Sequence, residues 1–395
     1  MMRAASRDAR VGLESHQEER RGFWGDRWFA WRDRLLAKQR FQRWAAGFPL
    51  TRKVAQKRAQ TLFDLCAGFV YSQILLACVQ LRLFEILSEG PQQAGELAHR
   101  LALPPDAALR LLNAAAALSL VQRRSHGRFG LGSLGAAFLG NPSIAAMVVH
   151  HAMLYADLRD PVRLLRGGDS DGDSDTVLSR YWRYACADQP GSLRPEDVAG
   201  YSALMSASQS LIAGDILDAW PFGAHRCLLD VGGGDGTFLA AAGVHAPNLQ
   251  LMLYDLPAVT ELAHARLGAA GLAPRTTVKS GDFFVQPLPG GADIVTVVRI
   301  LHDHDDADVV ALLRNIRRAI AADGVLLIAE PMSGMDTDLI SDAYFGFYLL
   351  AMKSGRTRAP ADFKSLLQNA GFDGGRVLRT RRPMLVNAIV ARPVG

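Results

Sequence analysis

The stretch LLDVGGGDGTFLAAA, residues 228–242, reads as a buried strand, a glycine-rich turn and the start of a helix. The apolar run closes at Asp230, and Gly232 and Gly234 open a GxGxG pattern. Glycine lets a backbone turn sharply after a strand and approach a ligand closely. A dinucleotide-binding fingerprint would place its third glycine where this chain has Thr237. The stretch therefore predicts an α/β fold with a ligand-binding turn of another kind.

Further apolar runs alternate with helical patterns through the last part of the chain. They are QLMLYD, TTVKSGDF, DIVTVVRIL and GVLLIAE. Buried parallel strands joined by right-handed helical crossovers give this alternation. The end differs, because RVLRTR and MLVNAIVAR flank Pro383 and predict an antiparallel hairpin added to the sheet. The pattern is typical of the Rossmann-like sheet of class I methyltransferases.

Acidic residues end three successive predicted strands: Asp230, Asp255 and Asp282, the last followed by Phe283. The carboxyl ends of parallel strands form the edge where ligands of open α/β sheets bind. We expect Asp255 to accept hydrogen bonds from both hydroxyls of a ribose, and Asp282 and Phe283 to bind an adenine. One acid alone would be read as a helix cap. Three in series favour an S-adenosylmethionine site.

The segment RILHDHDD, residues 299–306, follows the fourth predicted strand. We expect His302 to lie beside the cofactor's methyl group, and Glu330, which ends the fifth strand, to hold the other imidazole nitrogen. A hydroxyl group is a poor nucleophile while it keeps its proton, so His302 is predicted to be the general base of methyl transfer to oxygen. The rival interpretation is a metal site. We expect none, because side chains leaving a strand alternate in direction and Asp303 would not share a face with both neighbouring histidines.

The region before the sheet is predicted to be a winged helix. FVYSQILLACVQLRLFEIL, AGELAHRLAL and PPDAALRLLNAAAALSLV read as three helices, and VQRRSHGRFGLG as two short strands. DNA readout would need basic and amide side chains where the third helix has mainly alanine and leucine, so we expect protein contacts and no nucleic acid. The predicted domains are a basic extension (1–60), a winged-helix dimerisation domain (61–165), a linking loop and helices (166–219) and a methyltransferase domain (220–395).

The extension carries fifteen Lys and Arg against six Asp and Glu, whereas the whole chain has a net charge of +5. It also holds four of the six tryptophans, and Trp24, Trp28, Trp31 and Leu35 share one face of a predicted helix. Residues 20–60 are therefore predicted to touch a membrane surface. Packing of the aromatic face on the protein itself or on a partner chain is an equally weighted alternative.

We expect a cytoplasmic protein, with peripheral contact to the inner membrane as the further option. The four cysteines have no metal-ligand spacing and predict no disulfide framework. The N-terminus lacks the apolar region of a secretory signal. The longest apolar stretch, residues 69–84, is interrupted by Gln73, Gln80 and Arg82, so we expect no membrane-spanning helix.

From about residue 60 onward the motifs DVGGGDG, YDLP, GDFF, LHDH, AEPM and R-x-P-x-D-F before AGF follow in order. In these motifs the chain resembles the plant-type O-methyltransferases, the caffeate and acetylserotonin class. The resemblance implies a homodimer, S-adenosylmethionine as cofactor and no metal. It also implies His302 as base, Asp303 assisting at the substrate, Glu330 orienting the base, and cofactor contacts from Tyr201 and Met205.

Two positions depart from that class: the aromatic residue usual after His-Asp is His304, and the second catalytic glutamate aligns with Pro360. Over almost its whole length, including DAYFGFYLLAMKSGRTRAP, the chain is similar to the hydroxyneurosporene (1-hydroxycarotenoid) O-methyltransferases of phototrophic purple bacteria. That similarity implies a lipophilic hydroxycarotenoid as substrate, in carotenoid biosynthesis. Two alternatives stay open: an O-methyltransferase of a polyketide or phenolic small molecule, and a non-catalytic winged-helix regulator that senses S-adenosylmethionine.

Overall fold

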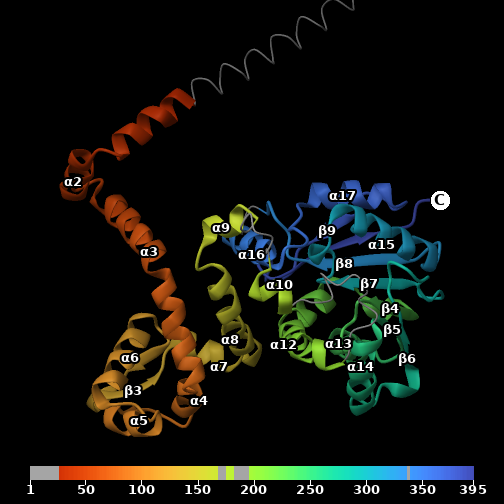
Figure 1. Cartoon of the computed structure of the whole chain (residues 1–395), viewed down its shortest axis with the longest axis horizontal. Helices are drawn as coiled ribbons and strands as arrows, with labels where there is room; N and C mark the ends of the chain where they lie inside the picture. The colour runs from red at the N-terminus through yellow and green to blue at the C-terminus, as the bar shows by residue number, and fades with distance from the viewer. Residues whose placement is uncertain (1–25, 168–174, 182–194, 336–338) are drawn as a thin grey trace, which may run out of the picture. The chain divides into compact units, whose positions relative to one another are not determined.

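The structure is a computed structural model of the 395-residue chain, and it describes residues 26–167, 175–181, 195–335 and 339–395. The chain divides into two compact units, Met1–Leu75 and Leu76–Gly395. Figure 1 colours the ribbon from the N-terminus in red to the C-terminus in blue. The predicted α/β sheet lies wholly within the second unit.

The first unit is helical. Residues 26–36 form a helix, α2 spans Gln39–Gly47, and α3 runs from Arg52 to Gln80, across the end of the unit. In the described residues, α3 is the one single helix long and apolar enough to cross a membrane by length and composition alone. The pair α7 (Ser133–Leu139) and α8 (Pro142–Asp157) passes the same test only jointly, across a 96° bend. These criteria do not separate a membrane span from an apolar helix that packs on protein.

The helix–helix–helix–hairpin order predicted for the next region is confirmed. Its elements are the end of α3, α4 (Leu83–Ser88), β1 (Gln92–Gln93), α5 (Ala94–Arg100), α6 (Pro105–Ala117), β2 (Val121–Arg123) and β3 (Arg128–Leu131). The strands pair antiparallel in the order β1-β3-β2. One detail of the prediction was wrong: FVYSQILLACVQLRLFEIL is not a single helix. Arg82 takes a left-handed conformation, φ 53°, and separates α3 from α4.

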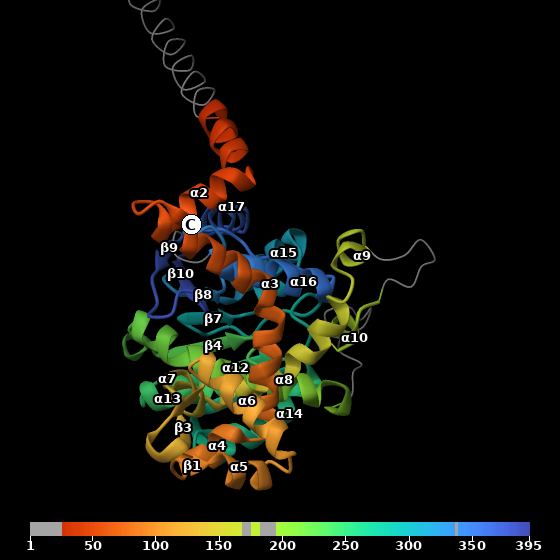
Figure 2. The ribbon, with the colours of Figure 1, turned by 90° about the vertical axis from the view of Figure 1, so that its left-hand side faces the viewer.

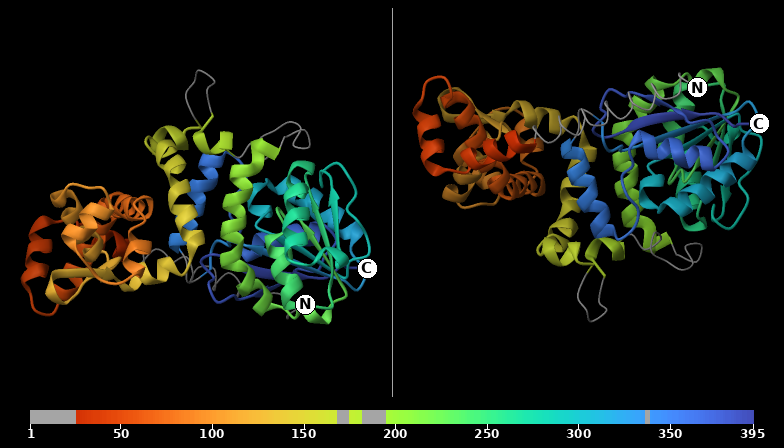
Figure 3. Two further views of the ribbon diagram at one scale, coloured as in Figure 1. Left: turned by 90° about the horizontal axis from the view of Figure 1, so that it is seen from below. Right: turned by 90° about the horizontal axis from the view of Figure 1, so that it is seen from above.

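Linking helices join this module to the sheet. They are α8, α9 (Pro161–Leu165), α10 (Val177–Tyr181), α12 (Pro195–Ala219) and, from later in the chain, α16 (Leu339–Met352). Figure 3 shows α8 in yellow, α16 in blue and α12 in green running beside one another. Leucines of α8, α9 and α10 pack with Tyr348, Leu349 and Met352 of α16 in one apolar cluster.

The sheet has the predicted strands in the order β6-β5-β4-β7-β8-β10-β9. They are β4 (Cys227–Val231), β5 (Gln250–Asp255), β6 (Thr276–Ser280), β7 (Ile294–Val298), β8 (Val325–Glu330), β9 (Arg376–Leu378) and β10 (Asn387–Ala391). Neighbours from β6 to β8 are parallel, whereas β10 is antiparallel to both β8 and β9, so the predicted closing hairpin is confirmed.

Helices cover both faces of this sheet (Figure 2). One apolar core lies between the strands and α12, α13 (Thr237–His245) and α14 (Pro257–Ala269). A second core lies between the strands and α15 (Asp306–Ala319) and α17 (Pro360–Asn369). The connection from β4 to β5 crosses one face of the sheet, and the connection from β7 to β8 crosses the other face. Because the connections diverge at the neighbouring strands β4 and β7, a crevice lies above the carboxyl ends of these two strands.

Helix α13 offers a test of this packing. Phe238 is 1% exposed and meets Phe222 edge-on, whereas Val244 on the same helix is 72% exposed. Phe238→Ala should lower the free energy of unfolding by about 3–5 kcal/mol, and Val244→Ala by less than about 0.5 kcal/mol. Denaturant unfolding at equal protein concentration measures both. Similar losses for the two variants would contradict the placement of α13.

Candidate active site

The glycine-rich turn after β4 is held against the end of β5. Gly232 and Gly234 have φ of 69° and 61°, values that favour glycine. A Cβ on Gly232 would lie 2.6 Å from Ile300 Cδ1, so the Ile300 side chain would have to move. The Gly234 amide donates to Asp255 Oδ2 at 2.7 Å, and Asp255 Oδ1 accepts from the Leu256 amide at 2.7 Å. Burial raises the pKa of Asp255 to about 6, against the effect of these two bonds.

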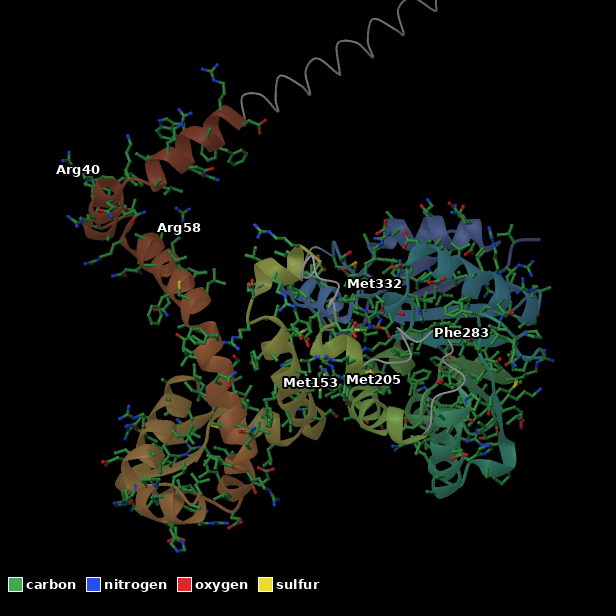
Figure 4. All side chains as sticks on the ribbon, viewed as in Figure 1. Arg40, Arg58, Met153, Met205, Phe283 and Met332 are labelled. Atoms are coloured by element: carbon green, nitrogen blue, oxygen red, sulfur yellow. The ribbon has the colours of Figure 1, made fainter. Side chains whose placement is uncertain are left out.

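A pocket opens above this turn, at the carboxyl edge of the sheet where ligands of open α/β folds bind. It is bounded by the β4 turn, the ends of β5 to β7, and α12. Met205 of α12 and Phe283 after β6 approach it from different elements (Figure 4). The predicted cofactor residues found in its wall are Met205, Gly232, Gly234, Asp255, Asp282 and Phe283.

Two predicted cofactor residues are placed differently. Tyr201 belongs to α12, but its side chain lies outside the described part of the chain. Asp230 is 1% exposed and lies behind the turn, not in the pocket wall. Its Oδ1 accepts from the Thr296 hydroxyl at 2.7 Å, while Oδ2 has no partner and sits 2.8 Å from where a Cβ on Gly233 would be. Burial raises the pKa of Asp230 to about 7.

The pocket wall also contains polar groups that the sequence analysis missed. Arg299 donates from Nη1 to Ser208 Oγ at 2.8 Å, and its backbone is left-handed, φ 57°. Three buried polar atoms of the wall have no hydrogen-bond partner in the structure: Gln209 Oε1, Arg299 Nε and Asp303 Oδ1. Buried polar atoms without partners are rare and mark a place where a polar ligand fits. The signal for Arg299 was its position at the head of RILHDHDD, whereas nothing in the α12 sequence singled out Gln209.

The sequence RILHDHDD forms a short turn after β7, with Leu301–Asp303 in a 3₁₀ helix. His302 Nδ1 lies 2.6 Å from Glu330 Oε2. The other oxygen, Glu330 Oε1, accepts from the amides of Ile300 and Leu301 at 2.9 and 2.7 Å. One carboxylate therefore holds both the imidazole and the backbone that carries it.

Asp303 lies on the other side of the imidazole, with Oδ1 3.1 Å from His302 Nε2 but without hydrogen-bond geometry. The strand alternation from which Asp303 was predicted not to share a face with both neighbouring histidines does not apply here, because these residues form a 3₁₀ turn rather than the end of a strand. Burial lowers the pKa of His302, but the charges of Asp303 and Glu330 outweigh it and raise the pKa above the ordinary 6.5. Burial raises the pKa of Asp303 to about 6.

His304, the residue that replaces the usual aromatic, also lines the pocket. Its ring meets Phe283 and Phe284 edge-on, at centroid distances of 5.9 and 5.1 Å. Burial lowers the pKa of His304 to about 4, so the ring is neutral at pH 7. Pro360 is the first residue of α17 and is not part of the pocket wall. In the described residues, no group of three or more His, Cys, Asp or Glu side chains is arranged to hold a metal ion.

The turn is supported from below by Arg358, which is 1% exposed. Arg358 donates from Nη1 to the Leu301 carbonyl at 2.5 Å and from Nη2 to the His304 carbonyl at 2.6 Å. Its Nε donates to Asp306 Oδ1 at 2.9 Å. The exposed Arg356 pairs with the same carboxylate.

These contacts give a matched pair of variants. Arg358→Met leaves two carbonyls of the turn without their donor, and should lower the free energy of unfolding by about 1–3 kcal/mol and reduce turnover. Arg356→Met removes a surface ion pair to the same Asp306, and should cost less than about 1 kcal/mol and spare turnover. Denaturant unfolding and steady-state rates measure both. Equal losses of stability and turnover in the two variants would show that Arg358 does not stabilise the turn.

Comparison with known proteins agrees with this geometry. A model of the O-methyltransferase dimerisation domain matches residues 63–141, and one of the O-methyltransferase domain matches residues 181–373. The chain is 43% identical to the demethylspheroidene O-methyltransferase of Cereibacter sphaeroides, over 91% of this chain and 93% of that protein. It is 39% identical to the protein of that name in Rhodobacter capsulatus, over 91% and 88% of the two chains.

More distant relatives share the fold. The mouse acetylserotonin O-methyltransferase is 32% identical over 82% of this chain and 86% of its own. A methyltransferase of calicheamicin biosynthesis, solved with SAH bound, has a TM-score of 0.70 and 28% identity, covering 86% of this chain and 99% of that one. The match of two domain models and these identities over most of the chain show that the protein belongs to the S-adenosylmethionine-dependent O-methyltransferase family.

Proposed function

We propose that this protein transfers a methyl group from S-adenosylmethionine to the hydroxyl of a 1-hydroxycarotenoid of the demethylspheroidene type. Two relatives named for demethylspheroidene, each alike over 91% of the chain, support this choice of substrate. The observation that carries the chemistry is the buried His302–Glu330 pair, whose histidine directly precedes Asp303 and His304 of the pocket wall. A sensor of the cofactor would not need a base with its own orienting carboxylate, so the pair argues against the regulator.

The residues of the pocket fit S-adenosylmethionine. Asp255 is placed to accept from the ribose hydroxyls, since each carboxylate oxygen bonded to a backbone amide keeps a second lone pair. Asp282 and Phe283 also line the pocket, and we assign them to the adenine. The unpartnered Arg299 Nε suits the carboxylate of the amino-acid end and Gln209 Oε1 suits its ammonium. When bound, the cofactor supplies an electrophilic methyl group on sulfur.

The carboxylates of Glu330 and Asp303 lie on the two sides of the His302 imidazole. His302 Nδ1–H donates a hydrogen bond to Glu330, and this leaves the lone pair on Nε2 to accept a proton from the acceptor hydroxyl. As the bond from oxygen to the methyl carbon forms and the bond from that carbon to sulfur breaks, leaving its electron pair on sulfur, Nε2 takes the hydroxyl proton and the imidazole becomes positive. Asp303 Oδ1, 3.1 Å from Nε2, and Glu330 then stabilise the charge on both sides. We assign His302 as base, Glu330 as the positioning residue, and Asp303 as the carboxylate beside the acceptor.

This assignment predicts a pH dependence. His302 must be neutral to accept a proton, so kcat/KM should rise with pH through its pKa. Because Asp303 and Glu330 raise that pKa, the midpoint should lie above 6.5. Glu330→Gln removes one of the two charges and should move the midpoint to lower pH. His302→Ala should remove the rising limb and lower kcat by roughly a hundredfold to ten-thousandfold, with cofactor affinity unchanged. A wild-type midpoint below 6.5, or near-normal kcat for His302→Ala, would refute the base.

The substrate is tested by product identification. Purified protein, methyl-labelled S-adenosylmethionine and detergent-solubilised demethylspheroidene should give a labelled methoxy-carotenoid. A panel of phenols and polyketides under the same conditions should give little label. Label on a phenol and none on the carotenoid would select the alternative enzyme, and no label on any acceptor with intact cofactor binding would select the regulator.

We also propose that residues 20–60 dock on anionic lipid at the cytoplasmic face of the inner membrane, where a carotenoid resides. The support is aromatic exposure beside positive charge: Trp28, Trp31 and Trp44 are 54–59% exposed. Arg40 on α2 and Arg58 on α3 are among the basic residues of this unit (Figure 4). Indole rings favour the interface and arginines attract anionic headgroups. Trp24 belongs to the same prediction but lies outside the described residues. We assign the exposed apolar side chains of α3, among them Leu62, Phe63 and Phe69, to a homodimer contact, which the match to the dimerisation-domain model supports.

The triple variant Trp28→Ser, Trp31→Ser and Trp44→Ser keeps the charge of the extension and removes its apolar side chains. The triple variant should lose most co-sedimentation with vesicles rich in phosphatidylglycerol, and most turnover of vesicle-borne carotenoid. Turnover of detergent-solubilised carotenoid should stay within about twofold of wild type, as the control. Unchanged vesicle binding would favour packing of the tryptophans on protein.

A further inference from the structure

Two neighbouring histidines of α8 meet two tyrosines of α16. His150 Nε2 lies 2.6 Å from the Tyr348 hydroxyl, and His151 Nε2 lies 2.7 Å from the Tyr344 hydroxyl. The tyrosines are one helical turn apart, with ring centroids separated by 5.9 Å. Apolar side chains would join the two helices without burying four polar groups. The paired polar groups therefore call for a reason other than packing.

His150, His151 and Tyr344 are neutral at pH 7. Burial lowers the pKa of His150 to about 4 and also lowers the pKa of His151. Burial raises the pKa of Tyr344 to about 12. Each pair is thus a hydrogen bond between a neutral imidazole and a phenol. A phenol hydroxyl both accepts and donates, so a Tyr344 oxygen that accepts from His151 Nε2–H keeps its own O–H for a second group.

The two pairs differ in their surroundings. His150 and Tyr348 are both buried, whereas His151 and Tyr344 are only half-buried. Tyr344 packs against the same apolar cluster as Met205, and Met205 lines the cofactor pocket. The His151–Tyr344 pair is therefore linked to the pocket wall through the apolar cluster that Tyr344 shares with Met205.

Two observations connect Tyr344 with the reacting centre. The charge of Arg299, in the pocket wall, lowers the pKa of Tyr344 against the larger effect of burial, and it also lowers the pKa values of His302 and Asp303. The chain after α16 is also fastened to the catalytic turn, because Ser354 Oγ donates to the Asp303 carbonyl at 2.8 Å. A Cβ on the next residue, Gly355, would lie 1.9 Å from the His302 carbonyl oxygen. The segment that follows α16 thus packs directly against the catalytic turn.

We propose that the Tyr344 hydroxyl, oriented by His151, donates a hydrogen bond to the reacting oxygen of the acceptor. An alcohol oxygen has one proton and two lone pairs. The proton goes to His302 Nε2. One lone pair forms the bond to the methyl carbon while the bond from that carbon to sulfur breaks and leaves its electron pair on sulfur. The other lone pair accepts the hydrogen bond from the Tyr344 hydroxyl. This contact rests on the proposed methyl transfer and makes Tyr344 a specificity-determining residue, which distinguishes the hydroxylated end of an apolar acceptor from an end without a hydroxyl group.

The test compares Tyr344→Phe with Tyr348→Phe, the same change one helical turn away. Both are assayed with detergent-solubilised demethylspheroidene, and the same polyene without its hydroxyl group serves as a competitive inhibitor. Tyr344→Phe should lower kcat/KM for demethylspheroidene by about three- to tenfold, the effect of one neutral hydrogen bond. The inhibition constant of the polyene and the cofactor affinity should not change. Tyr348→Phe should lower the melting temperature and leave kcat/KM within about twofold.

A purely structural role for Tyr344 would weaken demethylspheroidene and the polyene inhibitor together, and this result would overturn the proposal. So would wild-type kcat/KM in Tyr344→Phe. If Tyr344→Phe is unstable, the double variant His151→Leu with Tyr344→Phe removes both polar partners, and it should regain stability but not kcat/KM. Regained kcat/KM would also contradict the proposal. Failure of the wild-type protein to methylate demethylspheroidene would instead count against the proposed substrate.

Discussion

The Glu330 carboxylate is the interaction on which the site depends. It is fully buried at the end of β8 and takes three hydrogen bonds, from the amides of Ile300 and Leu301 and from the His302 imidazole. A buried carboxylate without partners would be very unfavourable, so these bonds are a condition of its burial. Since the sheet places β8 beside β7, one side chain fixes both the path of the catalytic turn and the direction of its histidine.

Asp255 does the same for the other half of the pocket. It joins the end of β5 to the glycine-rich turn after β4 through the Gly234 amide. Both carboxylates stand at the carboxyl edge of the sheet and use backbone amides of a neighbouring strand's turn. The cofactor side and the base side of the pocket are therefore built in the same way. In each, two parallel strands in register bring the acid at the end of one strand to the loop that follows its neighbour. The distance between the two halves is then set by the sheet.

Much of this could be predicted from the sequence. Five apolar runs of the right length gave the parallel strands, and acids at their ends marked the edge where the pocket lies. What failed depended on local backbone conformation. Arg82 breaks a continuous apolar helix through a left-handed residue, and the 3₁₀ turn at His302 brings Asp303 to its side, although alternation along a strand would separate them. Neither conformation has a signature in residue type.

The sequence also did not predict contacts between segments that lie far apart in the chain. Gln209 and Tyr344 lie on helices far from the strand motifs, and only the fold brings these helices to the pocket side.

The most direct test of the central claim is the tautomer of His302, read by nitrogen-15 NMR of the imidazole above its pKa and assigned with His302→Gln. The account predicts a proton on Nδ1, held by Glu330, and an unprotonated Nε2. A proton on Nε2 with Nδ1 bare would contradict it, because the base would then have no lone pair facing the acceptor.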